Sequence, residues 1–382
     1  MELPVYMDHN ATTALRPVVR DAVVRALGLT GNASSVHGAG RTARKVIEDA
    51  RDQVAALVGA KASEVVFTSG GTEANNLAIR GLETDSTRLR VLASAVEHVS
   101  VLKAAPNVEV IAVDAQGVVD LAALDAMLAE SAGGTGPVLV SVMLANNETG
   151  VLQPVAEVCA IAETHGAIVH CDAIQAVGKI PVDMAALGVH MMSLSAHKFG
   201  GPAGAGALVV AENSAQPLSG LALGGGQERG RRAGSENLPG IAGFGVAAEE
   251  ALKNVSNFAH LAVWRDRIEQ GLGRHSGVCV FGADAPRLCN TSCLTMPGVA
   301  AERQIIAFDL AGIALSAGSA CSSGKVEPSH VLAAMGVAAV EADTAIRISL
   351  GWTTTEQDVD AFLAAWAGIF ERAGAIKDGK AA

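Results

Sequence analysis

The sequence has no hydrophobic run long enough to cross a membrane. Its strongest apolar run, Val138 to Ala145, is far shorter than the roughly 20 residues that a membrane-spanning helix needs. The first residues, Met1 to Pro4, also lack the basic and then apolar pattern of a secretory signal peptide. We therefore expect a soluble, cytoplasmic protein with no membrane partner.

Positive charge and closely spaced cysteines are also scarce. Lysine and arginine total 28 against 39 aspartates and glutamates, a net charge of -11, which argues against binding to the phosphate backbone of nucleic acids. A local cluster, Arg229, Arg231 and Arg232, runs against this balance, either as a solvated loop or as a contact for a phosphate or a partner. The six cysteines have no C-x-x-C spacing, which indicates reduced thiols rather than disulfides or a zinc site.

Common motifs for nucleotides and metals are missing as well. The sequence has no G-x-G-x-x-G, and its nearest match to a phosphate-binding P-loop, Gly374 to Ala381, lacks the serine or threonine. There is no H-E-x-x-H pair, and we expect no resident metal. Disorder is not expected, because 50% of the 382 residues are hydrophobic and can bury a large core.

What the sequence does contain is an alternation of short, β-rich apolar runs with helical patterns. Arg41 to Val58 has helical periodicity, and Pro154 to Glu163 begins with the proline typical of a helix start. Strands that are apolar throughout and separated by helices predict an α/β fold with a mainly parallel seven-stranded sheet and helices on both faces. The seven runs are Val65–Thr68, Arg90–Ser94, Val108–Val113, Val138–Leu144, Ile168–Asp172, Met191–Ser195 and Ala207–Val210.

The remainder of the chain has a different pattern, typical of a separate, smaller α+β domain. A long amphipathic helix is expected from about Leu252, with more helices further on. The expected strands are Val278–Phe281, Thr291–Met296 and Ala345–Leu350. We therefore predict a large domain of residues 13–255 and a small domain formed by residues 1–12 and 256–382.

Lys198 and Asp172 carry the strongest chemical signal. Lys198 ends the run Ser195-Ala196-His197-Lys198, directly after an apolar strand, and Asp172 ends an earlier strand. A lysine there can form a Schiff base, and an acid there can keep a pyridine nitrogen protonated, as the chemistry of pyridoxal 5'-phosphate (PLP) requires. A lone His-Lys pair after a strand is more often a solvated strand end, so the neighbouring motifs decide between the two interpretations.

The glycine turn Gly70-Gly71-Thr72 links a strand to the start of a helix. Free amides at a helix N-terminus and the Thr72 hydroxyl form a ready site for an anion, although a capped tight turn would explain the same residues. Ser195 and His197 follow another strand and could bind the same anion, because ligands of open parallel sheets collect at the carboxyl ends of the strands. The pattern favours a phosphate site.

Two further segments follow predicted strands. His98 could stack on the ring of an aromatic cofactor and move protons, or it could be an ordinary surface histidine. The segment Asn146-Asn147-Glu148-Thr149-Gly150 has the composition of a turn. Its place after a strand favours contact with the cofactor or with a substrate carboxylate.

Arg347 and Cys321 are the candidates in the second domain. Arg347 lies in an alternating strand, and its guanidinium suits two-point recognition of a carboxylate, with a structural salt bridge as the equal alternative. Cys321 lies in Ser316–Gly324, a run of small residues that predicts a mobile loop with an exposed thiol. Such a thiol can travel to a substrate.

In their joint order and spacing, these motifs resemble the PLP-dependent cysteine desulfurases of the class V aminotransferase family, in the nitrogen-fixation type that supplies sulfur for iron–sulfur cluster assembly. The resemblance covers nearly the whole chain and includes three further segments, Tyr6–Thr13, Gly31–His37 and Gly224–Gly230. It implies the PLP-dependent transferase fold of type I, a homodimer, and conversion of L-cysteine to L-alanine.

The resemblance also implies a role for each candidate at the cofactor. Lys198 would carry the cofactor and move the α-proton of the substrate, and Asp172 would pair with the pyridine nitrogen. Gln175 would contact the ring hydroxyl, and His98 would stack on the ring and exchange protons. The phosphate would be held by Gly71, Thr72, Ser195, His197 and, from the partner subunit, Ser235, where the family often has threonine.

For the substrate, the resemblance implies that Asn147 contacts both cofactor and cysteine and that Arg347 binds the cysteine carboxylate. Cys321 would attack the substrate sulfur, hold it as a persulfide and pass it to an iron–sulfur scaffold protein, contacting the iron–sulfur site during transfer. Another class V PLP enzyme, such as an aminotransferase or a selenocysteine lyase, is the alternative. A sulfur-transfer scaffold without catalysis is the less favoured one, since it has no need of the full catalytic set.

Overall fold

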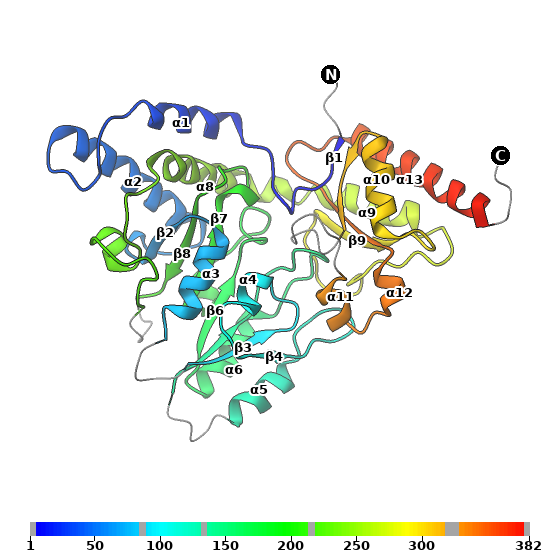
Figure 1. The fold of residues 1–382 in the computed structure, drawn as a ribbon, viewed down its shortest axis with the longest axis horizontal. Helices are drawn as coiled ribbons and strands as arrows, with labels where there is room; N and C mark the ends of the chain where they lie inside the picture. Colours follow the sequence, from blue (N-terminus) through cyan, green and yellow to red (C-terminus); the bar gives the residue numbers. More distant parts are fainter. Residues whose placement is uncertain (1–4, 84–88, 131–135, 213–217, 318–327, 378–382) are drawn as a thin grey trace.

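The computed structural model describes residues 5–83, 89–130, 136–212, 218–317 and 328–377, and Figure 1 shows how they are arranged. One group of elements surrounds a seven-stranded sheet, and a second, smaller group lies beside it on the right of Figure 1. Within these ranges, no helix has the length and apolar character needed to cross a membrane.

The large sheet has the strand order β2-β8-β7-β6-β5-β3-β4. β8 runs antiparallel to its neighbours β2 and β7, and the other neighbouring pairs are parallel. The predicted mainly parallel sheet is therefore confirmed. Its strands are β2 (Val65–Thr68), β3 (Arg90–Ser94), β4 (Val108–Ile111), β5 (Val138–Ser141), β6 (Ile168–Asp172), β7 (Met191–Ser195) and β8 (Gly206–Val210).

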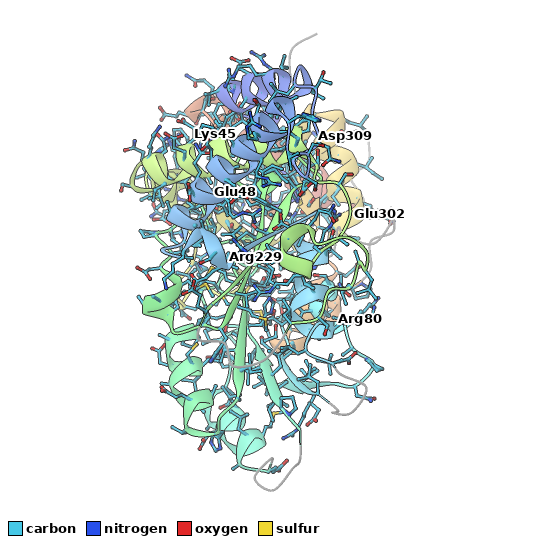
Figure 2. All side chains as sticks on the ribbon, turned by 90° about the vertical axis from the view of Figure 1, so that its left-hand side faces the viewer. Lys45, Glu48, Arg80, Arg229, Glu302 and Asp309 are labelled. Carbon is cyan, nitrogen blue, oxygen red and sulfur yellow. The ribbon has the colours of Figure 1, made fainter. Side chains whose placement is uncertain are left out.

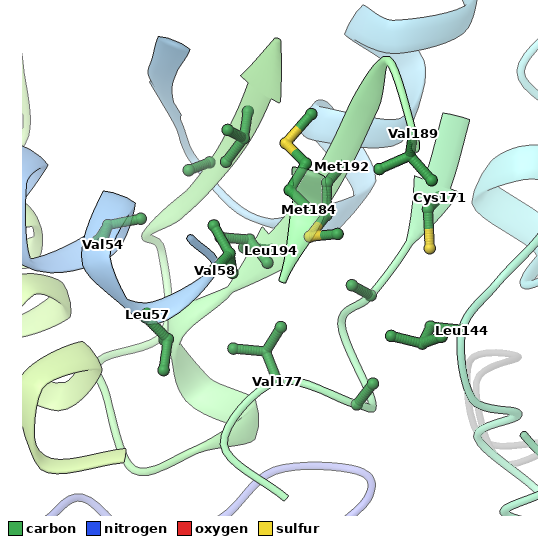
Figure 3. Close-up of a cluster of buried hydrophobic side chains, with 14 of the residues drawn as sticks. Val54, Leu57, Val58, Leu144, Cys171, Val177, Met184, Val189, Met192 and Leu194 are labelled. Atoms are coloured by element: carbon green, nitrogen blue, oxygen red, sulfur yellow. The ribbon is translucent and has the colours of Figure 1, made fainter. Parts of the chain in front are cut away.

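The sheet is buried on both faces, as its uninterrupted apolar strands require. Val66 of β2 packs in the hydrophobic cluster of α3 (Gly71–Arg80), whereas the next residue, Phe67, packs in the cluster of α2 (Gly38–Leu57) and α8 (Leu238–Phe258). Side chains alternate along a strand, so both faces receive apolar groups. Figure 3 shows part of the second cluster, including Val54 of α2 and Leu194 of β7.

The covering helices are amphipathic where they meet solvent. In α2, Ile47 and Val54 are buried, while Lys45 and Glu48 on the other side are exposed and labelled in Figure 2. α2 and α1 both pack against α8, and α5 packs against α6. The remaining helices of this group are α1 (Pro17–Leu27), α4 (Val99–Leu102), α5 (Leu121–Ala129), α6 (Val155–Thr164) and α7 (Met184–Leu187).

The second group has its own hydrophobic cluster, which includes Met7, Phe308 and Trp366. Its antiparallel sheet has the order β11-β12-β9, and a short parallel pair joins β1 to β10. The strands are β1 (Val5–Tyr6), β9 (Thr291–Thr295), β10 (Ile313–Ala314), β11 (Ser316–Ala317) and β12 (Ala345–Ser349). The helices are α9 (Leu261–Leu272), α10 (Ala301–Leu310), α11 (His330–Ala334), α12 (Ala339–Ala342) and α13 (Glu356–Lys377).

Three expectations from periodicity differ from the structure. The chain near Val278–Phe281 forms only an isolated bridge between Val280 and Leu294, because Gly277 and Gly282 bend the backbone with positive φ at either end. The helix expected from Leu252 begins at Leu238, where Asn237 accepts a hydrogen bond from the Gly240 N–H. β4 ends at Ile111 and β5 at Ser141, two and three residues before the apolar runs end. The domain limits at residues 13–255 stay a prediction.

Candidate active site

Four of the predicted residues lie at the carboxyl edge of the large sheet. His98 follows β3, Asn147 follows β5, Asp172 ends β6 and Lys198 follows β7. Because these strands are parallel, their ends meet at one edge. With Gln175 and Arg347 they line one cavity of about 130 Å³, and its other lining residues are Asn10, Ala11, Met143 and Ala145.

Asp172 is held by two N–H donors. Its Oδ2 accepts from Asn75 Nδ2 (2.8 Å), and its Oδ1 accepts from the backbone N–H of Ile174 (3.0 Å). Asn75 also donates to the Ser100 hydroxyl (2.9 Å). Asp172 is only 5% exposed, so its carboxyl group is fixed at the cavity. No motif identifies Asn75 in the sequence, although it lies one turn after Thr72 on α3.

His98 precedes α4 and is partly buried. The backbone N–H of Ser100 donates to His98 Nδ1 (3.2 Å), and the Ser100 hydroxyl lies 2.7 Å from the same nitrogen. Because Nδ1 accepts, the proton of the neutral ring is on Nε2. Burial lowers the pKa of His98 below its usual value; Asp172 opposes this shift and the charge of Lys198 adds to it. His98 is therefore a neutral group that can donate or accept a proton.

Lys198 contacts the segment Asp8–Thr13, which crosses the edge of the sheet. Its Nζ donates to the carbonyl oxygens of Asn10 (2.6 Å) and Ala11 (2.8 Å). Beside it, His197 Nδ1 lies 3.2 Å from the Thr12 hydroxyl, and burial, together with the charge of Lys198, lowers the pKa of His197 to about 4. Backbone far away in the sequence thus holds the amine at the cavity.

The predicted phosphate turn lies next to the end of β7. Gly71 is the first residue of α3, and a Cβ atom there would lie 2.1 Å from Ile174 Cδ1 and 3.5 Å from Ser195 Cβ. Glycine therefore lets the helix start approach the strand end. Thr72 is exposed at this helix start, where unpaired backbone N–H groups favour an anion. The structure brings Gly71, Thr72 and Ser195 together, with His197 in the turn that follows Ser195.

Arg347 is buried on β12 and lines the same cavity. Its Nη2 donates to Asp8 Oδ1 (2.7 Å), and its Nη1 donates to the Asn147 carbonyl (3.1 Å). Asp8 Oδ2 accepts from the Ser316 hydroxyl (2.7 Å). Arg347 Nε is buried without a hydrogen-bond partner among the described residues. The salt bridge is thus present, and at least one N–H donor, that of Nε, is left for a ligand.

A second buried lysine, Lys179, lies next to Gln175. Lys179 Nζ donates to Gln175 Oε1 and to Asn10 Oδ1 (2.7 Å each), and Gln175 Nε2 donates to the Asn10 carbonyl (2.9 Å). Burial lowers the pKa of Lys179 far below its usual value, and the charge of Lys198 adds to this shift. Lys179 does not stand out in the sequence, because an isolated lysine forms no pattern.

Ser235 and Cys321 do not belong to the cavity that the described residues form. Ser235 is exposed and lines a different cavity of about 160 Å³ with Ser69 and Arg232, so its role in a partner's site stays a prediction. Cys321 lies outside the described residues. The strand before it, β11, pairs Ser316 with Arg347, so the chain enters residues 318–327 beside the predicted carboxylate site.

The basic cluster has partners within the chain. Arg232 Nε lies 3.1 Å from Glu73 Oε1, and Arg229 donates to the carbonyl of Ser63. Glu73 Oε2 in turn accepts from the Ser69 N–H (2.8 Å). These contacts favour a structural role at the phosphate turn for Arg232.

The groups around the cavity fit PLP. An amine, a carboxyl group and an imidazole line one space, which suits the aldehyde, the pyridine nitrogen and the ring of that cofactor. The N-terminus of α3 and the nearby hydroxyls suit its phosphate. The unpaired N–H of Arg347 suits the carboxylate of an amino acid.

Comparison with known proteins agrees with this site. Residues 5–362 match the family described as aminotransferase class-V. A cysteine desulfurase of Sinorhizobium fredii is 44% identical over 94% of this chain and 95% of its own length. An IscS-like cysteine desulfurase of Mycobacterium tuberculosis is 41% identical over 96% of each chain.

Solved structures give the same result. The X-ray structure of a NifS-like protein from Rickettsia africae has a TM-score of 0.88 and 38% identity, and the match covers 96% of this chain and 99% of that one. A second NifS-like protein has a TM-score of 0.86 and 34% identity, over 97% of this chain and 100% of the other.

Proposed function

Because this chain belongs to the class-V aminotransferase family, alongside the cysteine desulfurases, we propose that it removes sulfur from L-cysteine and releases L-alanine. The observation that carries the proposal is the meeting of Lys198, Asp172 and Arg347 at one cavity of about 130 Å³. An amine, an acid and a carboxylate receptor in that space are what a PLP enzyme needs to act on an amino acid.

The enzyme is PLP-dependent, as its family is. When bound, PLP supplies an aldehyde that joins to amines and a ring that takes up electrons from the α-carbon. Lys198 would hold the aldehyde end, Asp172 the pyridine nitrogen and Gln175 the ring oxygen, with His98 against the ring. The phosphate would lie on Gly71, Thr72, Ser195 and His197, joined by Ser235 of a partner subunit.

The protein groups then orient cysteine and move its protons. Arg347 binds the cysteine carboxylate through N–H groups that Asp8 and Asn147 leave unused, and Asn147 lines the same cavity. Lys198 takes the α-proton and returns a proton to carbon. His98 is neutral, with its ring proton on Nε2, and it exchanges the protons that Lys198 does not move.

Sulfur leaves through Cys321, which is outside the described residues. Its thiolate attacks the substrate sulfur, so that a sulfur–sulfur bond forms while the carbon–sulfur bond breaks and its electron pair stays with the carbon fragment. Protonation of that fragment gives alanine, and a persulfide remains on Cys321. We propose that an iron–sulfur scaffold protein accepts this sulfur for cluster assembly, including the assembly that nitrogen fixation requires.

A homodimer and a reducing compartment complete the proposal. The loops at Gly31–His37 and Gly224–Gly230 flank one cavity of about 310 Å³, and beside it Val36 and Leu223 are 88% and 85% exposed, which supports a second copy of the chain there. The five cysteines within the described residues are free, which supports the cytoplasm.

The test is incubation of the holoenzyme with L-cysteine and a reductant, with alanine and sulfide measured together. We expect the two products in equal amounts. Alanine without sulfide, or no alanine at all, would contradict the proposal. A parallel incubation with L-selenocysteine decides the alternative, since a selenocysteine lyase would turn over the selenium substrate and leave cysteine almost untouched.

A further inference from the structure

Lys179 is buried at the active site, yet nothing in the proposed reaction uses it. It is 4% exposed, and it donates hydrogen bonds to the neutral amide oxygens of Asn10 and Gln175 rather than to a carboxylate. A buried amine costs free energy unless its N–H groups are satisfied. The arrangement therefore points to a role for the two amides that Lys179 binds.

The first of these amides, Asn10, makes hydrogen bonds to several groups of the site. Since a lysine Nζ donates, Asn10 Oδ1 must face Lys179, and Asn10 Nδ2 then donates to the Thr291 hydroxyl (2.9 Å) and the Asn147 carbonyl (3.2 Å). The Asn10 carbonyl accepts from both Lys198 and Gln175. Any movement of Asn10 therefore reaches the catalytic amine.

The second amide, Gln175, has its oxygen bound to Lys179 and one N–H bound to the Asn10 carbonyl. Gln175 lines the cavity of about 130 Å³, whereas Lys179 does not. With the oxygen occupied, what Gln175 can offer to the cavity is its remaining N–H.

We propose that Lys179 is a positioning residue, which holds Gln175 and Asn10 so that an amide N–H of Gln175 serves the ring oxygen of the cofactor. The inference rests on the proposed role of Gln175. Local backbone supports it: Gly178 has φ +79°, and a Cβ atom there would lie 2.7 Å from the Cβ of Phe199. Glycine thus lets Lys179 pack close to the turn that carries Lys198.

The test is a pH titration of the absorption band of PLP bound to the holoprotein, without substrate. An N–H donor favours the unprotonated ring oxygen, so loss of that donor should raise the pH at the midpoint of the titration. We expect Lys179→Met to raise the midpoint by about one pH unit, a tenfold change in proton affinity. Lys103→Met, which replaces an exposed lysine, should titrate like the wild type.

Gln175→Leu separates the inference from the assignment on which it rests. If Gln175→Leu raises the midpoint and Lys179→Met does not, Lys179 has no positioning role. If neither variant moves it, the role of Gln175 itself is wrong. Failure of the proposed function would appear elsewhere, as a wild type that shows the titration but releases no sulfide. Should Lys179→Met not fold, Lys179→Ala, which also removes the donor, carries the test, and an unchanged midpoint there overturns the inference.

Discussion

Two parts of the chain meet at the cavity and contribute different kinds of group. The strand ends of the large sheet contribute reactive side chains, those of His98, Asp172 and Lys198. The segment Asp8–Thr13 contributes mainly backbone, because the carbonyl groups of Asn10 and Ala11 accept the hydrogen bonds of Lys198. The sheet therefore supplies the chemistry, and the segment sets its geometry.

The difference follows from how each part is held. Neighbouring parallel strands fix one another in register, so side chains at their ends have defined places before any ligand binds. The segment is held instead by the second group of elements. Arg347 donates a hydrogen bond to Asp8, and the Asn10 N–H donates to the Ser349 hydroxyl (2.9 Å). Substitutions at strand ends should abolish turnover, and substitutions in the segment should alter affinity and stability.

The largest effect is expected for Lys198→Ala. The substitution removes both the amine that holds the cofactor and the group that moves the α-proton, so release of alanine and sulfide should stop. The matched change in the segment, Thr12→Ala, removes only the hydroxyl beside His197 and should cost no more than about tenfold, the worth of one hydrogen bond. Equal losses in the two variants would break the comparison.

Cys321→Ser should be nearly as severe, but at a later step. Serine is a poor nucleophile toward sulfur, so the variant should bind PLP and cysteine yet release almost no sulfide. Wild type given cysteine without reductant should gain one sulfur on the peptide that contains Cys321, measured by mass spectrometry. Burial raises the pKa of Cys159 to about 12 and that of Cys293 still higher, so these thiols stay protonated and unreactive. Extra sulfur on Cys159, Cys171, Cys279, Cys289 or Cys293 would contradict the mechanism.

Arg347→Ala and Asp8→Ala each remove one partner of the ion pair that joins β12 to the segment Asp8–Thr13. Arg347→Ala should weaken cysteine binding by about 2 to 5 kcal/mol while PLP stays bound, because it removes the carboxylate receptor. Asp8→Ala leaves a buried guanidinium without its carboxylate and should lower the free energy of unfolding by about 3 kcal/mol, with a smaller effect on cysteine binding. KM values and urea unfolding measure the two effects. Unchanged cysteine affinity with loss of PLP in Arg347→Ala would show that its role is wrong.

A more gradual effect is expected from acid. Burial lowers the pKa of His9 in the segment to about 4 and that of His170 in the sheet to about 3. The unfolded chain takes up these protons below about pH 6.5, so each histidine should lower the free energy of unfolding by about 1.4 kcal/mol per pH unit as pH falls below that value. The contribution of His9 should level off near pH 4 and that of His170 only near pH 3. We would measure the free energy of unfolding of His9→Gln and His170→Gln in urea across this pH range. Each variant should lose less stability per pH unit than the wild type. If its dependence on pH is unchanged in both variants, the low pKa values of these histidines are wrong.

Most of the sheet could be predicted because its signals are local. Apolar runs marked all seven strands. Asp172 and Lys198 stand at or just after the carboxyl ends of strands, where ligands of parallel sheets bind. Asn75 and Lys179 could not be predicted in this way, because their importance lies in contacts with residues on other elements. The strand expected at Val278–Phe281 failed for a related reason, since the glycines that flank it decide its backbone and its periodicity does not.

The hydrogen bond between Asn10 and Ser349 joins residues from opposite ends of the polypeptide. During synthesis, Asp172 and Lys198 leave the ribosome well before β12 exists, and until β12 arrives the N-terminal segment lacks the contacts that Arg347 and Ser349 supply. In a half-made chain, the segment whose carbonyl groups restrain the reactive lysine is therefore held from the side of the large sheet only. The connection makes completion of the cavity depend on β12, whose Arg347 is synthesised after the other residues that line it.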